Sequence, residues 1–483
     1  MSRPNLAGAP LAAAAAIIAA IFWPATAGAV PAAGGHGIDG AVLGLAWGLP
    51  FVGMLLSIAI LPLVAPHLWH RRYGTIAALW AILFLVPFAL TYGAEIASYE
   101  LAHIIVADYV PFIILLFALF TISGGILVTG NLHGSPATNT GMLAIGTVLA
   151  SFVGTTGASM VLIRPLLRAN DERRFRTHTV IFFIFLVSNI GGSLSPLGDP
   201  PLFLGFLRGV DFFWPTIHLI DDVLLLAGIL LPLFYLLDRY FYRREKDLPP
   251  RPDPTPDTRL GVKGLQNLPL LAIIIGAILM SATWQPGVEV PILGIDIPLQ
   301  SLVRDAIMLA CVLVSLLITP AELRERNGFD WEPIREVAKL FAAIFITIVP
   351  AIAILKAGTE GAAAPLINLV TGSSGEPVEI WYFWLTGGLS SFLDNAPTYL
   401  IFFNLAGGDP QELMHVRTLT LEAISAGAVF MGANTYIGNA PNFMVRSIAV
   451  NRGVPMPSFF GYMAWSGAVL VPLFVLVTLV MYR

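Results

Sequence analysis

The stretch Ser151-Phe-Val-Gly-Thr-Thr-Gly-Ala-Ser159 matches a later one, Ser391-Phe-Leu-Asp-Asn-Ala-Pro-Thr-Tyr399. Each begins with serine, phenylalanine and an aliphatic residue, and each continues into polar residues and helix breakers. A second pair, Pro196-Leu-Gly-Asp-Pro-Pro-Leu-Phe203 and Tyr436-Ile-Gly-Asn-Ala-Pro-Asn-Phe443, follows in the same order. The spacing between the two members is the same for both pairs. Two matches at one spacing indicate an internal repeat.

The composition predicts the environment in which this repeat folds. Of the 483 residues, 57% are hydrophobic and only 12% are charged, whereas a soluble domain carries about 25% charged residues. Apolar runs of about 20 residues, enough to cross a hydrocarbon core of about 30 Å, recur along the chain. We therefore expect an all-α polytopic membrane protein in contact with the lipid bilayer. The net charge of −4 gives no reason to expect a nucleic-acid partner.

Four of the apolar runs are interrupted by polar or turn-forming residues, and these four contain the repeated motifs. A stretch rich in proline and arginine, residues 239–266, separates the first two from the last two and is predicted to be a cytoplasmic linker. The predicted divisions are a first transmembrane half at 41–238, with a hairpin at about 140–166 and a broken helix at 178–206, and a second half at 267–483, with a hairpin at about 381–406 and a broken helix at 418–449.

The placement of lysine and arginine predicts the orientation, because these residues concentrate in cytoplasmic loops. Arg71, Arg72 and the basic linker all fall inside only if the hairpin at about 140–166 enters and leaves through the same face. The second hairpin then enters from the opposite side. The sequence thus predicts two inverted-topology repeats, each with a re-entrant hairpin and an unwound transmembrane helix.

The N-terminal residues resemble a targeting segment. Arg3 precedes an apolar stretch, Leu11–Trp23, which is followed by small residues up to Ala29. This order predicts a signal peptide at residues 1–29, and a first transmembrane helix that stays attached is the alternative. With a signal peptide, the expected location is a bacterial-type inner (plasma) membrane, crossed several times.

The four interrupted segments bring oxygen-bearing side chains to mid-membrane depth. Backbone groups freed by glycine and proline cannot face lipid, so irregular backbone there lines a cavity and offers oxygen atoms to an ion. Eight histidines are scattered without ligand spacing, and we expect no cofactor and no metal cluster beyond Na⁺. The candidate ligands for Na⁺ or a proton are Thr155, Thr156, Ser188, Asn189, Ser193, Ser195, Asp199, Ser391, Asp394, Asn395, Asn434, Thr435 and Asn439.

Asp199 and Asp394 are the two acidic members of this set. A carboxylate near the middle of a membrane costs roughly 3 kcal/mol even on mild insertion scales. Such a group binds a cation or carries a proton, or else it caps the free amides of a broken helix. We favour ion or proton binding for both residues, with capping as the alternative.

Other ionisable residues fall at predicted helix ends or near the start of broken helices. We expect them to face solvent or lipid headgroups, and we expect Arg164 to reach the cytoplasmic face or to contact an anion. Besides Arg164, the residues in this group are Asp108, His178, Asp221, Asp222, Arg304, Asp305 and Glu422.

At its motifs the chain resembles the ion transporter superfamily, which includes NhaD-type sodium/proton antiporters, arsenite-pump membrane subunits and citrate or dicarboxylate carriers. Asn189-Ile-Gly-Gly-Ser-Leu-Ser-Pro-Leu-Gly-Asp199 is similar to the NhaD-type unwound helix. Ser391-Phe-Leu-Asp-Asn395 is similar to the second hairpin tip of the antiporter and arsenite branches.

The resemblance implies an elevator-type carrier that forms a homodimer, in which hairpins and broken helices carry a bound ion between the two faces. It implies two related sites. The first comprises Thr155, Thr156, Asn189, Ser195 and Asp199, and the second comprises Asp394, Asn395, Asn434 and Asn439.

The sequence also departs from the branches of this superfamily. Carboxylate carriers show Ser-Asn-Thr at both hairpin tips, whereas this chain has Gly154-Thr-Thr156 and Asp394-Asn-Ala396. An aspartate at the second tip would repel an anionic substrate unless a cation neutralised it. Asp199-Pro200-Pro201 in turn resembles the arsenite branch.

Sodium/proton antiport by alternating access is the function we favour from the sequence. The alternative is Na⁺- or H⁺-coupled transport of citrate or another small carboxylate, and arsenite efflux is a weaker third. We expect no enzymatic activity. An intramembrane aspartyl protease would need a Gly-x-Gly-Asp motif, and the residues here are Pro196-Leu-Gly-Asp199.

Overall fold

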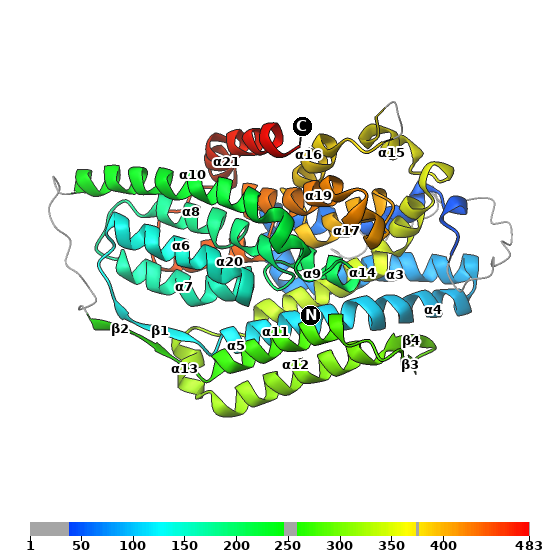
Figure 1. The fold of residues 1–483 in the computed structure, drawn as a ribbon, viewed down its shortest axis with the longest axis horizontal. Helices are drawn as coiled ribbons and strands as arrows, with labels where there is room; N and C mark the ends of the chain where they lie inside the picture. Colours follow the sequence, from blue (N-terminus) through cyan, green and yellow to red (C-terminus); the bar gives the residue numbers. More distant parts are fainter. Residues whose placement is uncertain (1–37, 246–257, 373–375, 483) are drawn as a thin grey trace, which may run out of the picture.

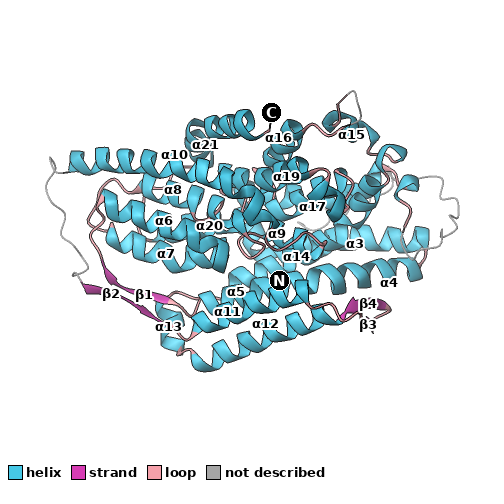
Figure 2. Cartoon of the chain, in the orientation of Figure 1, coloured by secondary structure: helices cyan, strands magenta, loops and turns pink. Residues whose placement is uncertain are grey.

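The computed structural model describes residues 38–245, 258–372 and 376–482 (Figure 1). Helices dominate this part of the chain (Figure 2). Nine helices within it, of 18 to 32 residues, are long and apolar enough to cross a membrane. At 1.5 Å per residue these lengths suit a hydrocarbon core of about 30 Å. The protein is therefore an all-α polytopic membrane protein, as predicted. The expected signal peptide at residues 1–29 lies outside the described residues.

The helices outside the four interrupted segments are uninterrupted. A π-helical turn, Ile104–Tyr109, joins the fourth and fifth helices. The helices of this kind are α2 (Leu49–Val64), α3 (Pro66–Tyr92), α4 (Ala94–His103), α5 (Val110–Ser123), α10 (Trp214–Glu245), α11 (Asn267–Thr283), α12 (Leu299–Ile318), α13 (Ala321–Arg326), α14 (Glu332–Lys356), α15 (Ala364–Val370), α18 (Pro410–His415) and α21 (Phe459–Met481).

Two short strand pairs lie at opposite ends of α11 and α12 (Figure 1). β1 (Leu127–Asn131) pairs antiparallel with β2 (Thr258–Lys263) and so connects the first half to the chain that leads into α11. β3 (Glu289–Ile292) and β4 (Ile295–Pro298) form a hairpin between α11 and α12. Its two-residue turn, Leu293 and Gly294, has positive φ at both positions, as the tight turns of hairpins require.

The four interrupted segments are each built from two shorter helices around non-helical backbone. They are a first hairpin, α6 (Pro136–Val153) and α7 (Thr155–Ala169); a first broken helix, α8 (Thr177–Leu186), a 3-10 turn (Ile190–Leu194) and α9 (Pro200–Leu207); a second hairpin, α16 (Glu379–Ser390) and α17 (Asn395–Leu405); and a second broken helix, α19 (Thr418–Met431), a 3-10 turn (Gly432–Asn434) and α20 (Ala440–Asn451).

Burial distinguishes the centre of the molecule from its lipid-facing surface. In the apolar window of Thr177–Leu194, 89% of the residues are buried, against 22% in α3. A helix that is apolar on all sides belongs either in a protein core or in lipid, and the first broken helix is in the core. The exposed leucine, isoleucine and valine side chains of α2, α3, α10 and α12 suit contact with acyl chains.

The region predicted as linker, residues 239–266, begins inside a helix. α10 continues through Glu245, because Arg173 and the backbone amide of Phe175 both bond to the Glu245 carboxylate, at 3.1 Å and 2.6 Å. β2 lies near the end of the same region. Residues 246–257 lie outside the described part of the chain.

Candidate functional site

Three neutral side chains donate hydrogen bonds to the Asp199 carboxylate. Oδ1 accepts from Thr155 Oγ1 at 2.9 Å and from Asn439 Nδ2 at 3.0 Å, and Oδ2 accepts from Asn395 Nδ2. All four side chains are buried. We call these four residues the Asp199 site. Thr155 and Asn395 come from the tips of the two hairpins. Asp199 and Asn439 immediately precede the second helix of the first and of the second broken helix.

The local sequence explains why Asp199 faces these side chains. It immediately precedes α9, the position from which an aspartate ordinarily caps free helix amides, yet it makes no capping hydrogen bond. The next residues are Pro200 and Pro201, and proline has no N–H to offer. Both carboxylate oxygens are therefore left for donors from other segments, so the capping alternative does not describe Asp199.

Asp394 has different contacts, although it too precedes a short helix. Its Oδ1 accepts a hydrogen bond from the backbone N–H of Ala396 at 3.2 Å, which caps α17. This cap turns the chain so that the next side chain, Asn395, reaches Asp199. Asn395 Oδ1 is buried and has no hydrogen-bond donor among the described residues. A buried carbonyl oxygen without a donor is a candidate ligand for a cation.

Asparagine amides connect the two broken helices behind Asp199. Asn439 Nδ2 lies 3.2 Å from Asn189 Oδ1 as well as within reach of Asp199. Asn189 Nδ2 donates to Asn442 Oδ1 at 2.7 Å. Asn442 Nδ2 in turn donates to two backbone carbonyls of the second irregular stretch, at 2.9 Å each. The irregular backbone groups are thus paired within the protein, as a non-aqueous environment requires.

The first hairpin tip is held by the broken helix beside it. Ser151 Oγ donates to Gly191 O at 2.5 Å, and Ser195 Oγ donates to Ser151 O. Both hydroxyls therefore satisfy carbonyls that non-helical backbone leaves free. The contacts fix the tip that carries Thr155.

The second hairpin tip is held in the same way. Ser391 Oγ donates to Met431 O at 3.1 Å, and Thr435 Oγ1 donates to Ser391 O at 2.5 Å. The residues involved follow their first-half counterparts by 240 residues, the separation between Asp199 and Asn439. The second half therefore repeats both the sequence motifs of the first half and the hydrogen bonds that these motifs make.

Glycine is required where each broken helix folds back on itself. A Cβ at Gly198 would lie 2.1 Å from Gly192 O, and a Cβ at Gly438 would lie 2.5 Å from Gly432 O. No side chain fits at either distance. These close approaches bring Asp199 and Asn439 to corresponding places in the two halves.

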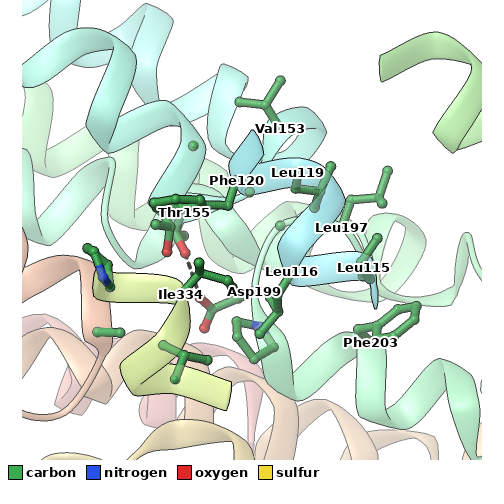
Figure 3. Close-up of a pocket in the computed structure, with 18 of the residues that line it drawn as sticks. Leu115, Leu116, Leu119, Phe120, Val153, Thr155, Leu197, Asp199, Phe203 and Ile334 are labelled. Atoms are coloured by element: carbon green, nitrogen blue, oxygen red, sulfur yellow. Dashed lines mark hydrogen bonds between the residues drawn. The ribbon is translucent and has the colours of Figure 1, made fainter. Parts of the chain in front are cut away.

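A pocket opens on one side of the Asp199 site (Figure 3). Figure 3 shows the Thr155 hydroxyl and the Asp199 carboxylate facing each other, with apolar side chains of α5 and Ile334 of α14 around them. Among the residues that line it, Asp199 is the single charged one. The pocket therefore gives a route to the carboxylate between the first hairpin, α5 and the beginning of α14.

Four arginines form a cluster at the C-terminal ends of α7 and α20 and on α13. Arg164 and Arg168 stand one helical turn apart on α7 and interact electrostatically with each other and with Arg452, which follows α20. Arg168 also interacts with Arg326 of α13. Arg164 Nη1 and Arg168 Nε are buried without a hydrogen-bond acceptor among the described residues. Arg164 Nη2 donates to Gly328 O at 3.3 Å. We call Arg164, Arg168, Arg326 and Arg452 the arginine cluster.

The remaining sequence-predicted ligands lie around the Asp199 site without contacting the carboxylate. Thr156 lines the pocket. Ser188 Oγ is 2.9 Å from Ser159 Oγ, and Asn434 Nδ2 donates to Ser391 Oγ at 3.0 Å. Asn189 bonds to side chains of the second broken helix, and Ser195 and Thr435 hold the backbone, as described above. Ser193 Oγ donates to Ile190 O.

Sequence reasoning overlooked Asn442 and Ser151 as structural members of this region. Both stood inside the repeated motifs, Ser151 at the start of the first and Asn442 in the last. Their position in a repeat was the available signal. What the repeat could not show is that Asn442 reaches Asn189 in the opposite half.

Several ionisable residues expected at solvent or headgroup level are buried instead. Asp108 is paired with Arg208 at 2.9 Å, and Arg304 is paired with Asp305 at 2.8 Å. His178 is bonded to Asp238 at 2.8 Å. Those expectations were wrong, because each charge has a partner on the protein side that a reading of helix ends does not show. Asp222 and Glu422 are also buried.

Comparison with known proteins identifies the family. A family model described as "Putative citrate transport" matches residues 40–482. Two uncharacterized transporters, from Mycobacterium bovis and Mycobacterium tuberculosis, are each 25% identical over 335 residues, which cover 67% of this chain and 72% of theirs. The match extends over nearly the whole described structure, including both hairpins and the Asp199 site. The chain therefore belongs to the transporter family described as putative citrate transport.

Proposed function

We propose that this protein is an ion-coupled secondary transporter of citrate or a similar small carboxylate, and that its coupling cation or proton binds at the Asp199 site. The observation that carries this proposal is the set of donors to Asp199. A buried carboxylate whose hydrogen-bond partners are all neutral either keeps its negative charge and attracts a cation, or takes up a proton. Membership of the family supports a carboxylate as the substrate.

We further propose that the two halves are inverted-topology repeats with re-entrant hairpins. The recurrence of the serine and threonine contacts at one spacing supports a repeat. Basic residues are found on α7 and in the region that follows α10. They support a cytoplasmic location for the end of α7 and for that region. In this arrangement Thr155 and Asn395 approach Asp199 from opposite faces of the membrane.

The geometry suggests how binding and movement are coupled. Asp199 contacts both hairpin tips, so a cation that binds its oxygens competes with the Thr155 hydroxyl and the Asn395 amide. Binding of a cation at the Asp199 site therefore changes the contacts between the segments that would move during alternating access. The oxygen atoms proposed to bind Na⁺ or a proton are those of Thr155, Thr156, Ser188, Asn189, Ser195, Asp199, Asp394, Asn395, Asn434, Thr435 and Asn439.

The arginine cluster supports an anionic substrate. Guanidinium groups pair with carboxylates through parallel hydrogen bonds, and donors on Arg164 and Arg168 have no acceptor among the described residues. Several like charges close together raise the local concentration of anions. We propose that this cluster attracts the carboxylate on the cytoplasmic side.

Sodium/proton antiport is the second candidate function. It is favoured by one observation, that the charged residue lining the pocket is an aspartate and no arginine lines it. Under this alternative, Na⁺ and H⁺ would compete for Asp199, and the arginine cluster would have no substrate. Arsenite efflux rests on the Pro200-Pro201 pair alone. For every candidate we propose a homodimer in a bacterial-type inner membrane.

Transport assays in proteoliposomes distinguish these functions. Labelled citrate uptake should be driven by an inward Na⁺ or H⁺ gradient, because the substrate and the coupling ion enter together. Asp199→Asn should abolish gradient-driven uptake, since it removes the charge that binds the ion. Asp211→Asn, which changes an exposed aspartate, serves as the control and should retain uptake.

The alternative outcome is equally specific. Na⁺-dependent dissipation of a pH gradient without citrate uptake, lost in Asp199→Asn, would replace the carboxylate proposal by antiport. Citrate uptake that survives in Asp199→Asn with unchanged ion dependence would remove Asp199 from the mechanism.

A further inference from the structure

A second cavity, of about 380 Å³, lies away from the Asp199 site, and we call it the outer cavity. It is enclosed by the end of α4, the π-helical turn, the end of α14, the residue after α9 and the chain before α2. Acids outnumber lysine and arginine among its described lining residues, which does not favour an anion-binding site. The charged and titratable residues that line it are Asp39, Glu100, His103, Asp108, Arg208 and Lys356.

The outer cavity and the pocket beside Asp199 lie at opposite ends of two helices. Ile334 near the beginning of α14 lines the pocket, and Lys356 at the end of α14 lines the outer cavity. Asp199 immediately before α9 lines the pocket, and Arg208 immediately after α9 lines the outer cavity. α14 is long and apolar enough to cross a membrane. If it does, the two cavities lie toward opposite faces, and the positive-inside pattern assigns the outer cavity to the outside.

One ion pair in the outer cavity connects α9 to the helices that precede the first hairpin. Arg208 Nη2 donates to Asp108 Oδ2 at 2.9 Å, and the two side chains are only 20% and 7% exposed, so water competes little for either charge. Asp108 lies in the π-helical turn between α4 and α5. Turns of this kind interrupt α-helices mostly at functional sites. The pair therefore bridges a continuous part of the fold and the first broken helix.

α9 connects this ion pair to the Asp199 site. The helix has eight residues, which at 1.5 Å per residue separate its two ends by about 12 Å. A helix this short moves as one body, because its backbone hydrogen bonds fix every residue relative to the others. Any movement of α9 relative to α5 that displaces the Asp199 carboxylate therefore also withdraws Arg208 from Asp108.

We propose that the Asp108–Arg208 ion pair is a latch that stabilises the conformation in which Asp199 faces the pocket and is closed off from the outer cavity. Asp199 lines the pocket and is absent from the described residues that line the outer cavity. This inference rests on the alternating access proposed above. Asp108 and Arg208 are positioning residues, because they act on the Asp199 site through α9 and not by contact with the transported ion.

The outer cavity also allows the latch to open. Separating a buried ion pair is costly when either charge is left without a partner. Lys356 and Glu100 line the same cavity, so a base for Asp108 and an acid for Arg208 are available once α9 has moved. The pair is therefore suited to a contact that forms and breaks, rather than to one that only stabilises the fold.

Cysteine labelling of the full chain in inside-out membrane vesicles tests the latch. Ala440 lines the pocket and is exposed, so Ala440→Cys in a Cys311→Ser background reports whether the pocket is open. Asp108→Asn and Arg208→Gln should each slow its reaction with a membrane-impermeant maleimide by about fivefold or more, the lower range of coupling between two conformations. The exchanged pair, Asp108→Arg with Arg208→Asp, should restore the rate.

Arg304→Gln is the matched control for the loss of a buried ion pair. Arg304 Nε is bonded to Asp305 Oδ1 at 2.8 Å, but the two residues are neighbours on α12 and connect no separate segments. The substitution should lower the unfolding temperature and leave the labelling rate unchanged.

Two outcomes would overturn the proposal. In the first, Asp108→Asn and Arg208→Gln lower the unfolding temperature but label at the parent rate, as expected of a purely structural pair. In the second, the exchanged pair folds but labels as slowly as the single variants. Either single variant that remains folded is sufficient for the comparison. No substrate is added, so these results do not depend on the carboxylate assignment, which uptake by Asp199→Asn tests separately.

Discussion

Asp199 and Asp394 occupy similar places in the sequence but have different contacts. Each precedes a short helix at a break. Asp199 is followed by two prolines, which offer no amide to cap, and the next amide, that of Leu202, bonds to the Asp199 backbone carbonyl at 3.1 Å, whereas the Asp394 side chain accepts a hydrogen bond from the Ala396 amide. From the residue types alone, the same role of ion or proton binding was predicted for both acids. The proline pair is the signal that separates them, because it removes the helix amides that would otherwise hold the Asp199 carboxylate.

Two substitutions of Asp394 distinguish the contribution of its N-cap hydrogen bond from the contribution of its charge. Asp394→Ala should lower the free energy of unfolding by about 1 kcal/mol, the usual value of an N-cap, and Asp394→Asn should cost only a few tenths because asparagine caps as well. Unfolding followed by intrinsic fluorescence in detergent measures both. Equal losses in the two variants would show that the charge, rather than the cap, stabilises the tip.

The donors to Asp199 could not be predicted from the sequence. Thr155, Asn395 and Asn439 were all candidate ligands, but the same reasoning also named Thr156 and Asn434, which do not contact the carboxylate. Asp221 and Asp222 show the same limit. Neighbours on a helix point about 100° apart, so Asp221 faces outward while Asp222 is buried, and the sequence does not reveal which of the two turns inward.

The hairpins and broken helices are the elements for which the sequence carries the clearest signal. Glycine, proline and polar residues interrupt runs that would otherwise be spans, so their positions could be read directly. The sequence did not predict the strand pair β1 and β2. Those strands are short, and β1 pairs with a strand inside the basic region, far away in the sequence, so no local pattern predicts the pairing.

The first hairpin depends on its tip glycine. Gly154 has φ of 80° and ψ of 151°, a conformation available essentially to glycine alone, so Gly154→Ala should cost about 1–3 kcal/mol. Gly141→Ala in α6 is the matched control: a Cβ there meets no atom within 4 Å, and alanine should raise stability by about 0.5–1 kcal/mol. Thermal unfolding of both variants measures the difference. A neutral Gly154→Ala would show that the tip can relax.

At the scale of the whole molecule, α11 and α12 carry a strand pair at each end (Figure 1). β3 and β4 connect the two helices at one end, and β2 leads into α11 at the other. If α11 and α12 cross the membrane, the two strand pairs lie on opposite sides. The positive-inside pattern assigns β2 to the cytoplasm.

Cysteine labelling tests this orientation, because Cys311 is the single cysteine in the chain. In a Cys311→Ser background, Leu293→Cys in the β3–β4 turn should react with a membrane-impermeant maleimide on intact cells. Val262→Cys in β2 should react only after permeabilisation. Both side chains are exposed, so access depends on the side of the membrane. The reverse labelling pattern would invert the proposed topology.

The Asp199 site has a consequence for biosynthesis. Its donor Asn395 follows Asp199 by 196 residues and Asn439 by 240. At translation rates of about 5–20 residues per second, these amides emerge on the order of tens of seconds after the carboxylate. During that interval the nascent first half can offer Asp199 only the Thr155 hydroxyl. The ribosome therefore delivers the two halves of one binding site at different times, and the carboxylate must wait, protonated or hydrated, for the second half to arrive.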